Sequence, residues 1–214
     1  AAGDETTQLT WMDAKIEDWV VTPRDGKAVE INGLWYNALK IGEYFATKLE
    51  DVEATERYGR LARRTRIGFQ QFWSPELGYC YDVLRPDGRD DSLRPNQLIA
   101  CALPYGLLTL EQRRSIIQTV SEELLVPFGL RTLACCHTGY RPVYAGDRWA
   151  RDAAYHQGTV WPWLLGPYLN TYFDVMGATV ENRRRIRALI QPLVDHLDRA
   201  GLGSVSEIFD AQEP

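Results

Sequence analysis

Apolar residues recur every three or four positions in three stretches of the chain, which is the spacing of one face of an α-helix. Charged residues occupy the remaining positions, so each helix is predicted to bury one face and expose the other. Pro192 falls inside the last stretch and is expected to bend that helix without ending it. The three predicted amphipathic helices cover residues 52–72, 111–125 and about 182–197.

A less polar helix is predicted before each amphipathic one. These partners cover residues 30–49, 95–103 and 160–176, so they begin about 65 residues apart, which indicates a repeated helical pair. Long connections precede each pair and contain short extended segments. One such segment covers residues 79–84 and leads into a turn at Pro86-Asp87-Gly88.

Three such pairs predict an all-α fold, namely half of an α/α toroid. The less polar helices would line the inside of the ring, the amphipathic ones would form its outside, and the loops would build a cleft at one end. We therefore interpret residues 1–214 as a single partial domain, the C-terminal half of a ring in a longer protein. Inner helices left uncovered in a half-ring would expose apolar surface, so self-association is expected.

Composition and charge narrow the choice of partners. The net charge of −5 offers no general attraction for phosphate backbones or anionic lipids, so nucleic acid and membrane partners are not expected. No apolar run approaches the roughly 18 residues that span a bilayer, and the first residues lack the features of a secretion signal. Four cysteines without metal-ligand spacing predict free buried thiols in a reducing cytoplasm, with no metal or cofactor.

Six of the seven tryptophans fall in two windows, residues 9–36 and 148–163. Each window also holds acidic, amide or basic side chains. Aromatic faces can stack on the C–H face of a sugar while polar groups bind its hydroxyls, so the windows predict a carbohydrate cleft. Candidate binding residues are Trp11, Trp19, Arg24, Lys27, Glu30, Trp35, Arg94, Tyr155, His156, Gln157 and Trp161.

Glycoside hydrolysis needs a carboxylic acid for the leaving oxygen and a second carboxylate. Asp13 is the candidate acid, because Trp11 and Trp19 flank it and aromatic walls would favour its protonated form. Glu207 is the candidate base, in an extended, glycine-containing segment after the last helix. The alternatives are that Asp13 caps a helix and that Glu207 is a surface residue beside a short strand. For the polar binding candidates, ordinary salt bridges and loop hydrogen bonds are equally good interpretations.

At these same residues the chain resembles the C-terminal glucosidase domain of glycogen debranching enzymes, the amylo-α-1,6-glucosidases. The matching segments occur in the family's order, and a weaker likeness to trehalases points the same way. They are residues 8–15, 21–27, 29–39, 93–97, 155–164 and 206–210.

The resemblance implies an (α/α)6 barrel that hydrolyses the α-1,6-linked glucose of branched α-glucans such as glycogen and limit dextrin, with inversion. It implies that Asp13 is the general acid, that Glu207 is the general base, and that Glu30 and the aromatic residues shape the glucose subsite. Gly33 departs from the alanine expected in the family motif, which we expect only to loosen a helix start. The first half of the barrel, and any glucanotransferase activity, would lie outside this chain.

Two other functions compete with this interpretation. A non-catalytic helical domain could bind glucan by ring stacking alone, and it would not need Asp13 and Glu207 in one cleft. A helical peptide-binding repeat would form an open superhelix in which the two tryptophan windows do not meet.

Overall fold

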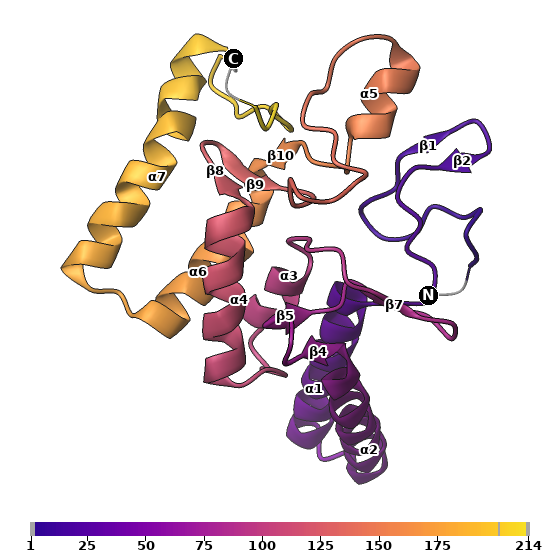
Figure 1. Cartoon of the computed structure of the whole chain (residues 1–214). Coiled ribbons are helices and arrows are strands. Elements are labelled where there is room, and N and C mark those ends of the chain that lie inside the picture. The colour runs from indigo at the N-terminus through magenta and orange to yellow at the C-terminus, as the bar shows by residue number, and fades with distance from the viewer. Residues whose placement is uncertain (1–2, 201, 213–214) are drawn as a thin grey trace.

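The computed structural model describes residues 3–200 and 202–212, and within them the three predicted helix pairs are confirmed (Figure 1). None of the helices in these residues is long and apolar enough to cross a bilayer. The pairs are α1 (Val29–Lys48) with α2 (Val52–Phe69), α3 (Gln97–Ala102) with α4 (Leu110–Glu123), and α6 (Leu165–Met176) with α7 (Val180–Arg199).

The second helix of each pair begins with a side chain that caps it. Asp51, Thr109 and Thr179 accept hydrogen bonds from backbone N–H groups in the first turns of α2, α4 and α7. The first helix of each pair has no such cap, since α1, α3 and α6 continue from strands, turns or 3-10 segments already fixed by the fold. A helix that starts at an exposed turn therefore needs a capping side chain from its own sequence to bind its first free backbone N–H groups.

Short strands fill the connections between helices. They form four small antiparallel sheets, ordered β1-β2, β3-β6-β7, β4-β5 and β10-β9-β8. Their bounds are β1 Lys15–Ile16, β2 Trp19–Val20, β3 Lys27–Ala28, β4 Trp73–Ser74, β5 Tyr79–Cys80, β6 Val83–Leu84, β7 Arg89–Asp90, β8 Leu125–Val126, β9 Gly129–Arg131 and β10 Val160–Trp161. The predicted extended segment and turn near residue 80 are thus confirmed, because β6 and β7 form a hairpin around Pro86-Asp87-Gly88.

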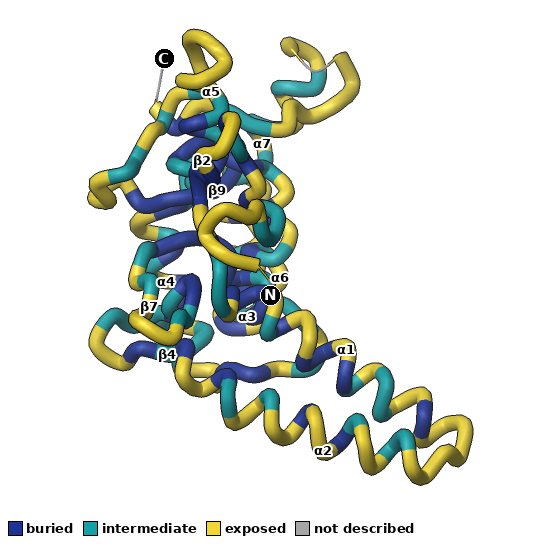
Figure 2. The backbone as a smooth tube through the Cα atoms, turned by 90° about the vertical axis from the view of Figure 1, so that its right-hand side faces the viewer, coloured by how far each residue is buried: buried dark blue, intermediate teal, exposed yellow. Residues whose placement is uncertain are grey.

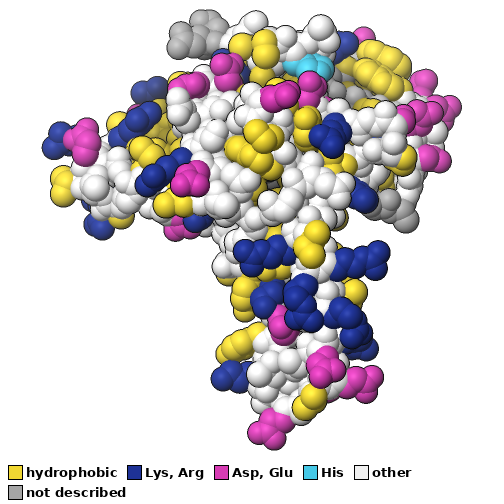
Figure 3. Space-filling view, turned by 60° about the horizontal axis from the view of Figure 1, so that its bottom comes forward, with side chains coloured by type: hydrophobic (Ala, Val, Ile, Leu, Met, Phe, Trp, Pro, Cys, Tyr) yellow, Lys and Arg dark blue, Asp and Glu magenta, His cyan; other side chains and the backbone are white. Residues whose placement is uncertain are grey.

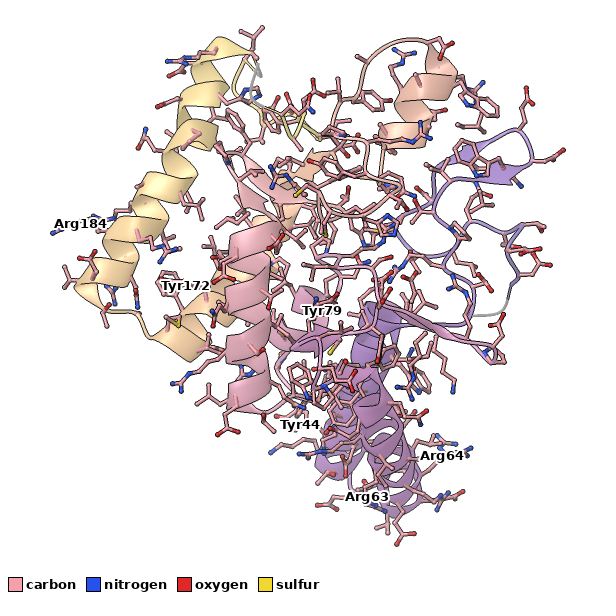
Figure 4. The ribbon with its side chains drawn as sticks, in the orientation of Figure 1. Tyr44, Arg63, Arg64, Tyr79, Tyr172 and Arg184 are labelled. Carbon is pink, nitrogen blue, oxygen red and sulfur yellow. The ribbon has the colours of Figure 1, made fainter. Side chains whose placement is uncertain are left out.

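The main core lies where α1, α3, α4 and α6 meet the strands, and Figure 2 shows buried positions concentrated there. The α1–α2 hairpin projects from this body, and its far end is exposed (Figure 2). Arginines cover the solvent side of α2, where Arg63 and Arg64 extend outward in Figure 4 and basic side chains gather along the hairpin in Figure 3. At the third pair, Tyr172 of α6 donates a hydrogen bond to Asn182 of α7.

The face of α1 that points away from α2 is apolar and exposed. Its exposed side chains are Ile31, Leu34, Trp35, Ile41 and Phe45. The half-ring interpretation predicts an exposed apolar surface of this kind on an inner helix, and the ring itself stays a prediction. The self-association expected from this surface also stays a prediction.

Three details differ from the sequence-based expectations. A seventh helix, α5 (Arg148–Ala154), lies inside the second tryptophan window, where no helix was predicted. The predicted helix at residues 160–176 begins as strand β10 and a 3-10 turn, Pro162–Leu164, before α6. All four cysteines are free, but Cys135 and Cys136 are exposed, so the prediction of buried thiols holds only for Cys80 and Cys101.

Gly33 lies inside α1 and does more than loosen a helix start. A Cβ atom placed on it would lie 2.9 Å from the Cβ of Ala100, on α3. Real Cβ atoms do not approach so closely, so glycine lets the two inner helices pack together. The contrast is Gly68 in α2, where an added Cβ would have no neighbour within 4 Å.

We predict that Gly33→Ala destabilises the protein. Overpacking typically costs about 1–3 kcal/mol, and the gain in helix propensity returns at most about 1 kcal/mol. Denaturant unfolding should therefore show a net loss of about 1–2 kcal/mol. Gly68→Ala is the matched control and should be neutral or mildly stabilising; equal effects at both positions would contradict close packing at Gly33.

Candidate functional site

The two tryptophan windows meet in space. Trp11 packs edge-on against Trp161 and Trp163, with ring centroids 5.3 and 5.0 Å apart. Trp19 of β2 stacks on Trp149 of α5 at 5.5 Å. A peptide-binding repeat predicted separate windows, so this clustering contradicts that alternative.

A buried ion cluster lies beneath Trp11. The Arg24 guanidinium donates to both carboxylate oxygens of Asp82, at 2.8 and 3.0 Å, and to both of Glu30. It also donates to the Thr10 hydroxyl. Burial alone would lower the pKa of Arg24, but the ion pairs with Asp82 and Glu30 raise it above its ordinary value. Every donor of Arg24 is therefore used inside the protein.

The ion cluster also fixes Trp11. The Asn96 side chain donates to Asp82 at 2.8 Å and accepts a hydrogen bond of 2.8 Å from the Trp11 indole N–H. Asp82 and Asn96 were not predicted as site residues, because each meets its partners across distant parts of the chain. The only available signal was Asn96 itself, which lies within the matching segment at residues 93–97.

Arg94 ties the second window to the rest of the site. It donates to the backbone oxygens of Thr132 and His156 and to the side chain of Gln157, at 2.8–3.0 Å. Gln157 in turn donates to the backbone oxygen of Val21, at 2.9 Å. Burial lowers the pKa of Arg94, and the like charge of Arg24 adds to this effect. Arg94 and Gln157 thus hold the two windows together.

His156 is fully buried and lies between the aromatic rings. It stacks on Trp161, with centroids 5.1 Å apart, and neither of its ring nitrogens has a hydrogen-bond partner. Burial lowers the pKa of His156 to about 3, and the charges of Arg94 and Arg24 act in the same direction. The ring is therefore neutral near pH 7 and is a packing residue in this structure.

These contacts revise part of the predicted binding set. Arg24, Arg94 and His156 are buried, and their polar contacts are internal or absent, so they cannot fix sugar hydroxyls as predicted. Glu30 is also buried and held by Arg24, although its side chain reaches the wall of a cavity described below. The alternative for the arginines was a surface salt bridge or a loop hydrogen bond; Arg24 forms buried ion pairs instead, and Arg94 donates buried hydrogen bonds.

The candidate base Glu207 has one specific partner from the second window. Tyr155, the residue that ends α5, donates a hydrogen bond of 2.6 Å to the Glu207 carboxylate. Burial raises the pKa of Tyr155, and the hydrogen bond and charge of Glu207 raise it further. Tyr155 therefore keeps its proton at neutral pH and can donate this hydrogen bond.

The candidate acid Asp13 lies near the same phenol. Tyr155 packs against a small core that includes Ala14, the residue after Asp13, and the charge of Asp13 makes the smallest contribution to the raised pKa of Tyr155. Asp13 lies in a loop before β1 and caps no helix. It is exposed rather than enclosed by Trp11 and Trp19 as expected, because Trp19 turns to stack on Trp149.

The backbone around Glu207 is fixed from both sides. Phe209 pairs with Val160 through two backbone hydrogen bonds of 2.9 and 3.0 Å, and its ring stacks on Phe128 at 4.5 Å. On the other side, the Ser206 hydroxyl and the His196 ring of α7 are 2.9 Å apart. Glu207 is exposed beside this pairing, as expected both for a functional loop residue and for the alternative of a surface glutamate beside a short strand.

An apolar cavity of about 560 Å³ opens beside Trp11, between the inner helices. Trp163 and Glu30 also line it, and the remaining lining residues come from α1, α3 and α6 and their ends, namely Ile31, Leu34, Ile99, Ala102, Leu103, Gly166, Pro167 and Asn170. Asp13 and Glu207 do not line this cavity. Trp163 belongs to the site by this contact, although it was not predicted as a binding residue.

Two predicted binding residues stay apart from these clusters. Lys27 is exposed on β3, which pairs with β6. Trp35 is exposed on α1 and belongs to the uncovered apolar face. Among the described residues, no group of three or more His, Cys, Asp or Glu side chains could hold a metal ion.

Comparison with known proteins identifies relatives over the whole chain. Residues 1–214 match the family described as amylo-alpha-1,6-glucosidase. The glycogen debranching enzyme of Saccharomyces cerevisiae is 31% identical over 206 residues, covering 76% of this chain and 13% of the yeast protein. The chain therefore spans only a small part of that relative.

Solved structures share the fold at low identity. A sialidase matches with a TM-score of 0.69 and 18% identity, over 89% of this chain and 18% of its own. Neutral trehalase Nth1 from Saccharomyces cerevisiae gives 0.64 and 17%, over 86% and 34%. A GH63 mannosylglycerate hydrolase from Thermus thermophilus, in complex with glucose, gives 0.62 and 15%, over 86% and 39%.

We predict that His156 makes the fold acid-sensitive. Its pKa is about 3 in the folded protein and about 6.5 when unfolded, so between these values the unfolded chain binds the extra proton. The stability contribution is complete above about pH 6.5 and is lost as the pH falls toward 3, by up to about 1.4 kcal/mol per pH unit. His156→Phe, which keeps a flat ring against Trp161, should reduce this slope.

Unfolding by denaturant at pH 4.5, 5.5 and 7.5 would measure the effect. His137→Phe is the control, because His137 is exposed. The buried-histidine interpretation fails if the His156→Phe variant and the wild type lose stability in parallel below pH 6.5.

Proposed function

The chain belongs to the amylo-alpha-1,6-glucosidase family, and we propose that it is the part of an α-1,6-glucosidase that carries both catalytic carboxylates. In this proposal the complete domain is an (α/α)6 barrel that releases glucose from the branch points of glycogen or limit dextrin, with inversion at the anomeric carbon. The free cysteines suit the cytoplasm as its setting.

The observation that supports this function best is the set of neighbours of Tyr155. The phenol donates a hydrogen bond to Glu207 and packs against the small core that includes Ala14, the residue after Asp13, although the two carboxylates are far apart in the sequence. An inverting hydrolase needs two carboxyl groups across one sugar, with room for a water molecule between sugar and base. A glucan-binding scaffold has no use for such a pair.

The proposed reaction divides the work between the two groups. Asp13 gives its proton to the glycosidic oxygen as the C–O bond breaks. Glu207 takes a proton from a water molecule whose oxygen attacks the anomeric carbon from the opposite face. Because Tyr155 occupies one carboxylate oxygen of Glu207, the other oxygen is available to the water.

The glucose subsite in this proposal is aromatic. Trp11 lies two residues before Asp13 and is fixed by Asn96, and it packs against Trp161, which contacts the Tyr155 ring, so this aromatic group and not the apolar cavity adjoins the candidate carboxylates. Stacking on these rings would orient the sugar. Glu30 and Arg24 do not contact the sugar in this proposal. They belong to the buried ion cluster that holds Trp11 in place.

The direct test compares glucose release from limit dextrin by the full-length protein and by variants. Asp13→Asn and Glu207→Gln should each lower kcat by about 10² or more, as expected when a general acid or base is removed. Asp18→Asn is the control, because it removes an exposed carboxylate from the same β1–β2 hairpin and should be neutral. Folded Asp13 and Glu207 variants with normal rates would leave a glucan-binding scaffold as the better function.

Tyr155→Phe should slow the reaction without preventing folding. A hydrogen bond to a charged group is worth about 1.5–3 kcal/mol, so kcat should fall by about 10- to 100-fold with little change in KM. Steady-state kinetics with limit dextrin would measure both constants.

The matched control for Tyr155 is Tyr144→Phe, since the Tyr144 ring lies 5.5 Å from the Tyr155 ring. In the Glu207→Gln background, Tyr155→Phe should have almost no further effect on kcat. An unchanged kcat, or equal effects in both backgrounds, would show that Tyr155 is not a positioning residue for Glu207.

A further inference from the structure

Trp19 and Trp149 form an exposed stacked pair on the two segments that adjoin Asp13 and Tyr155. Trp19 is 38% exposed and Trp149 is 51% exposed, even though their rings stack on each other at an interplanar angle of 28°. An indole offers a flat apolar face and one N–H donor, which suits a sugar, because the C–H face of a sugar can stack on the ring while its hydroxyls accept hydrogen bonds.

The pair sits on a fixed base. A small core of Ala14, Ile16, Val21 and Ala153 joins the β1–β2 hairpin to α5, and Tyr155 packs against it. The hydrogen bond from Gln157 to Val21 adds a second connection between the two segments. Figure 1 shows α5 and the hairpin beside each other at one end of the molecule. The rings therefore form a stable platform.

The same two segments carry the candidate catalytic groups. Asp13 immediately precedes the hairpin that holds Trp19, and Tyr155 ends the helix that holds Trp149. Six residues along a helix correspond to about 9 Å, so the platform lies within the reach of a short oligosaccharide from Tyr155. Arg148 and Asp152 on α5 pair at 3.5 Å beside the platform and offer polar groups for hydroxyls.

We propose that Trp19 and Trp149 form a binding platform for the glucan chain beyond the scissile bond, distinct from the Trp11 subsite. This inference rests on the proposed function, which supplies the α-glucan as ligand. Sugar rings of the chain stack on the outward aromatic faces, while the terminal glucose occupies the site at Trp11. The platform raises the affinity for long glucan chains and does not change the rate of bond cleavage.

The test measures glycogen binding by affinity electrophoresis, with Glu207→Gln as the common background so that hydrolysis cannot interfere. Trp149→Ala should weaken binding by about 3- to 10-fold, and Trp19→Ala should do the same. The double variant should be little worse than either single one, because the rings act as one platform. The control is Tyr44→Ala, which removes an aromatic ring of the same 51% exposure from the far end of α1 (Figure 4).

Kinetics in the wild-type background separate this inference from the proposed function. Trp149→Ala should raise KM for limit dextrin while kcat and the KM for a short branched oligosaccharide stay unchanged. Unchanged glycogen retention, or an equal loss with Tyr44→Ala, would overturn the platform. If Trp149→Ala weakens binding but Glu207→Gln still releases glucose, the carboxylate assignment fails and the platform stands.

Discussion

The buried pairing of Arg24 with Asp82 and Glu30 is the constraint on which the rest of the site depends. These charges come from the N-terminal segment, the connection after β5 and the first turn of α1. Removing a charge from water costs several kcal/mol, and the hydrogen-bonded pairing with opposite charges offsets that cost, so the position of each of the three segments depends on the other two. Asp82 then holds Asn96, and Asn96 holds Trp11. The position of Trp11, and of the rings that pack against it, thus depends on the buried ion pair.

This arrangement separates the groups that hold the site from the groups that face solvent. The buried polar residues of the two tryptophan windows, such as Arg24, make internal contacts, and so does Gln157. Asp13 and Glu207 are exposed, together with the rings of Trp19 and Trp149 and other charged residues such as Asp18. Reactive groups on a rigid support need little reorganisation when a substrate arrives, which favours catalysis by positioning.

The sequence predicted the helical pairs well because their apolar periodicity is long and regular. It did not predict α5, since seven residues are too few to show a period beside so many aromatic residues. Local patterns also could not assign Asp82 and Asn96, whose partners lie 58 to 85 residues away. Gly33 was misjudged for the same reason, because Ala100, not its own helix, decides what fits there. The role of a residue whose contacts lie far away in the sequence can be assigned only from the folded structure.

The exposure of Asp13 bears on how the proposed acid would work. Trp19 stacks on Trp149, and Trp11 packs against Trp161 and Trp163, so neither ring encloses the carboxylate. The loop that carries Asp13 leads directly into the β1–β2 hairpin, which is held against α5 by a small core. In the proposed reaction this support sets the position of the acid, and the bound substrate completes its surroundings, so catalysis depends on positioning by the fold.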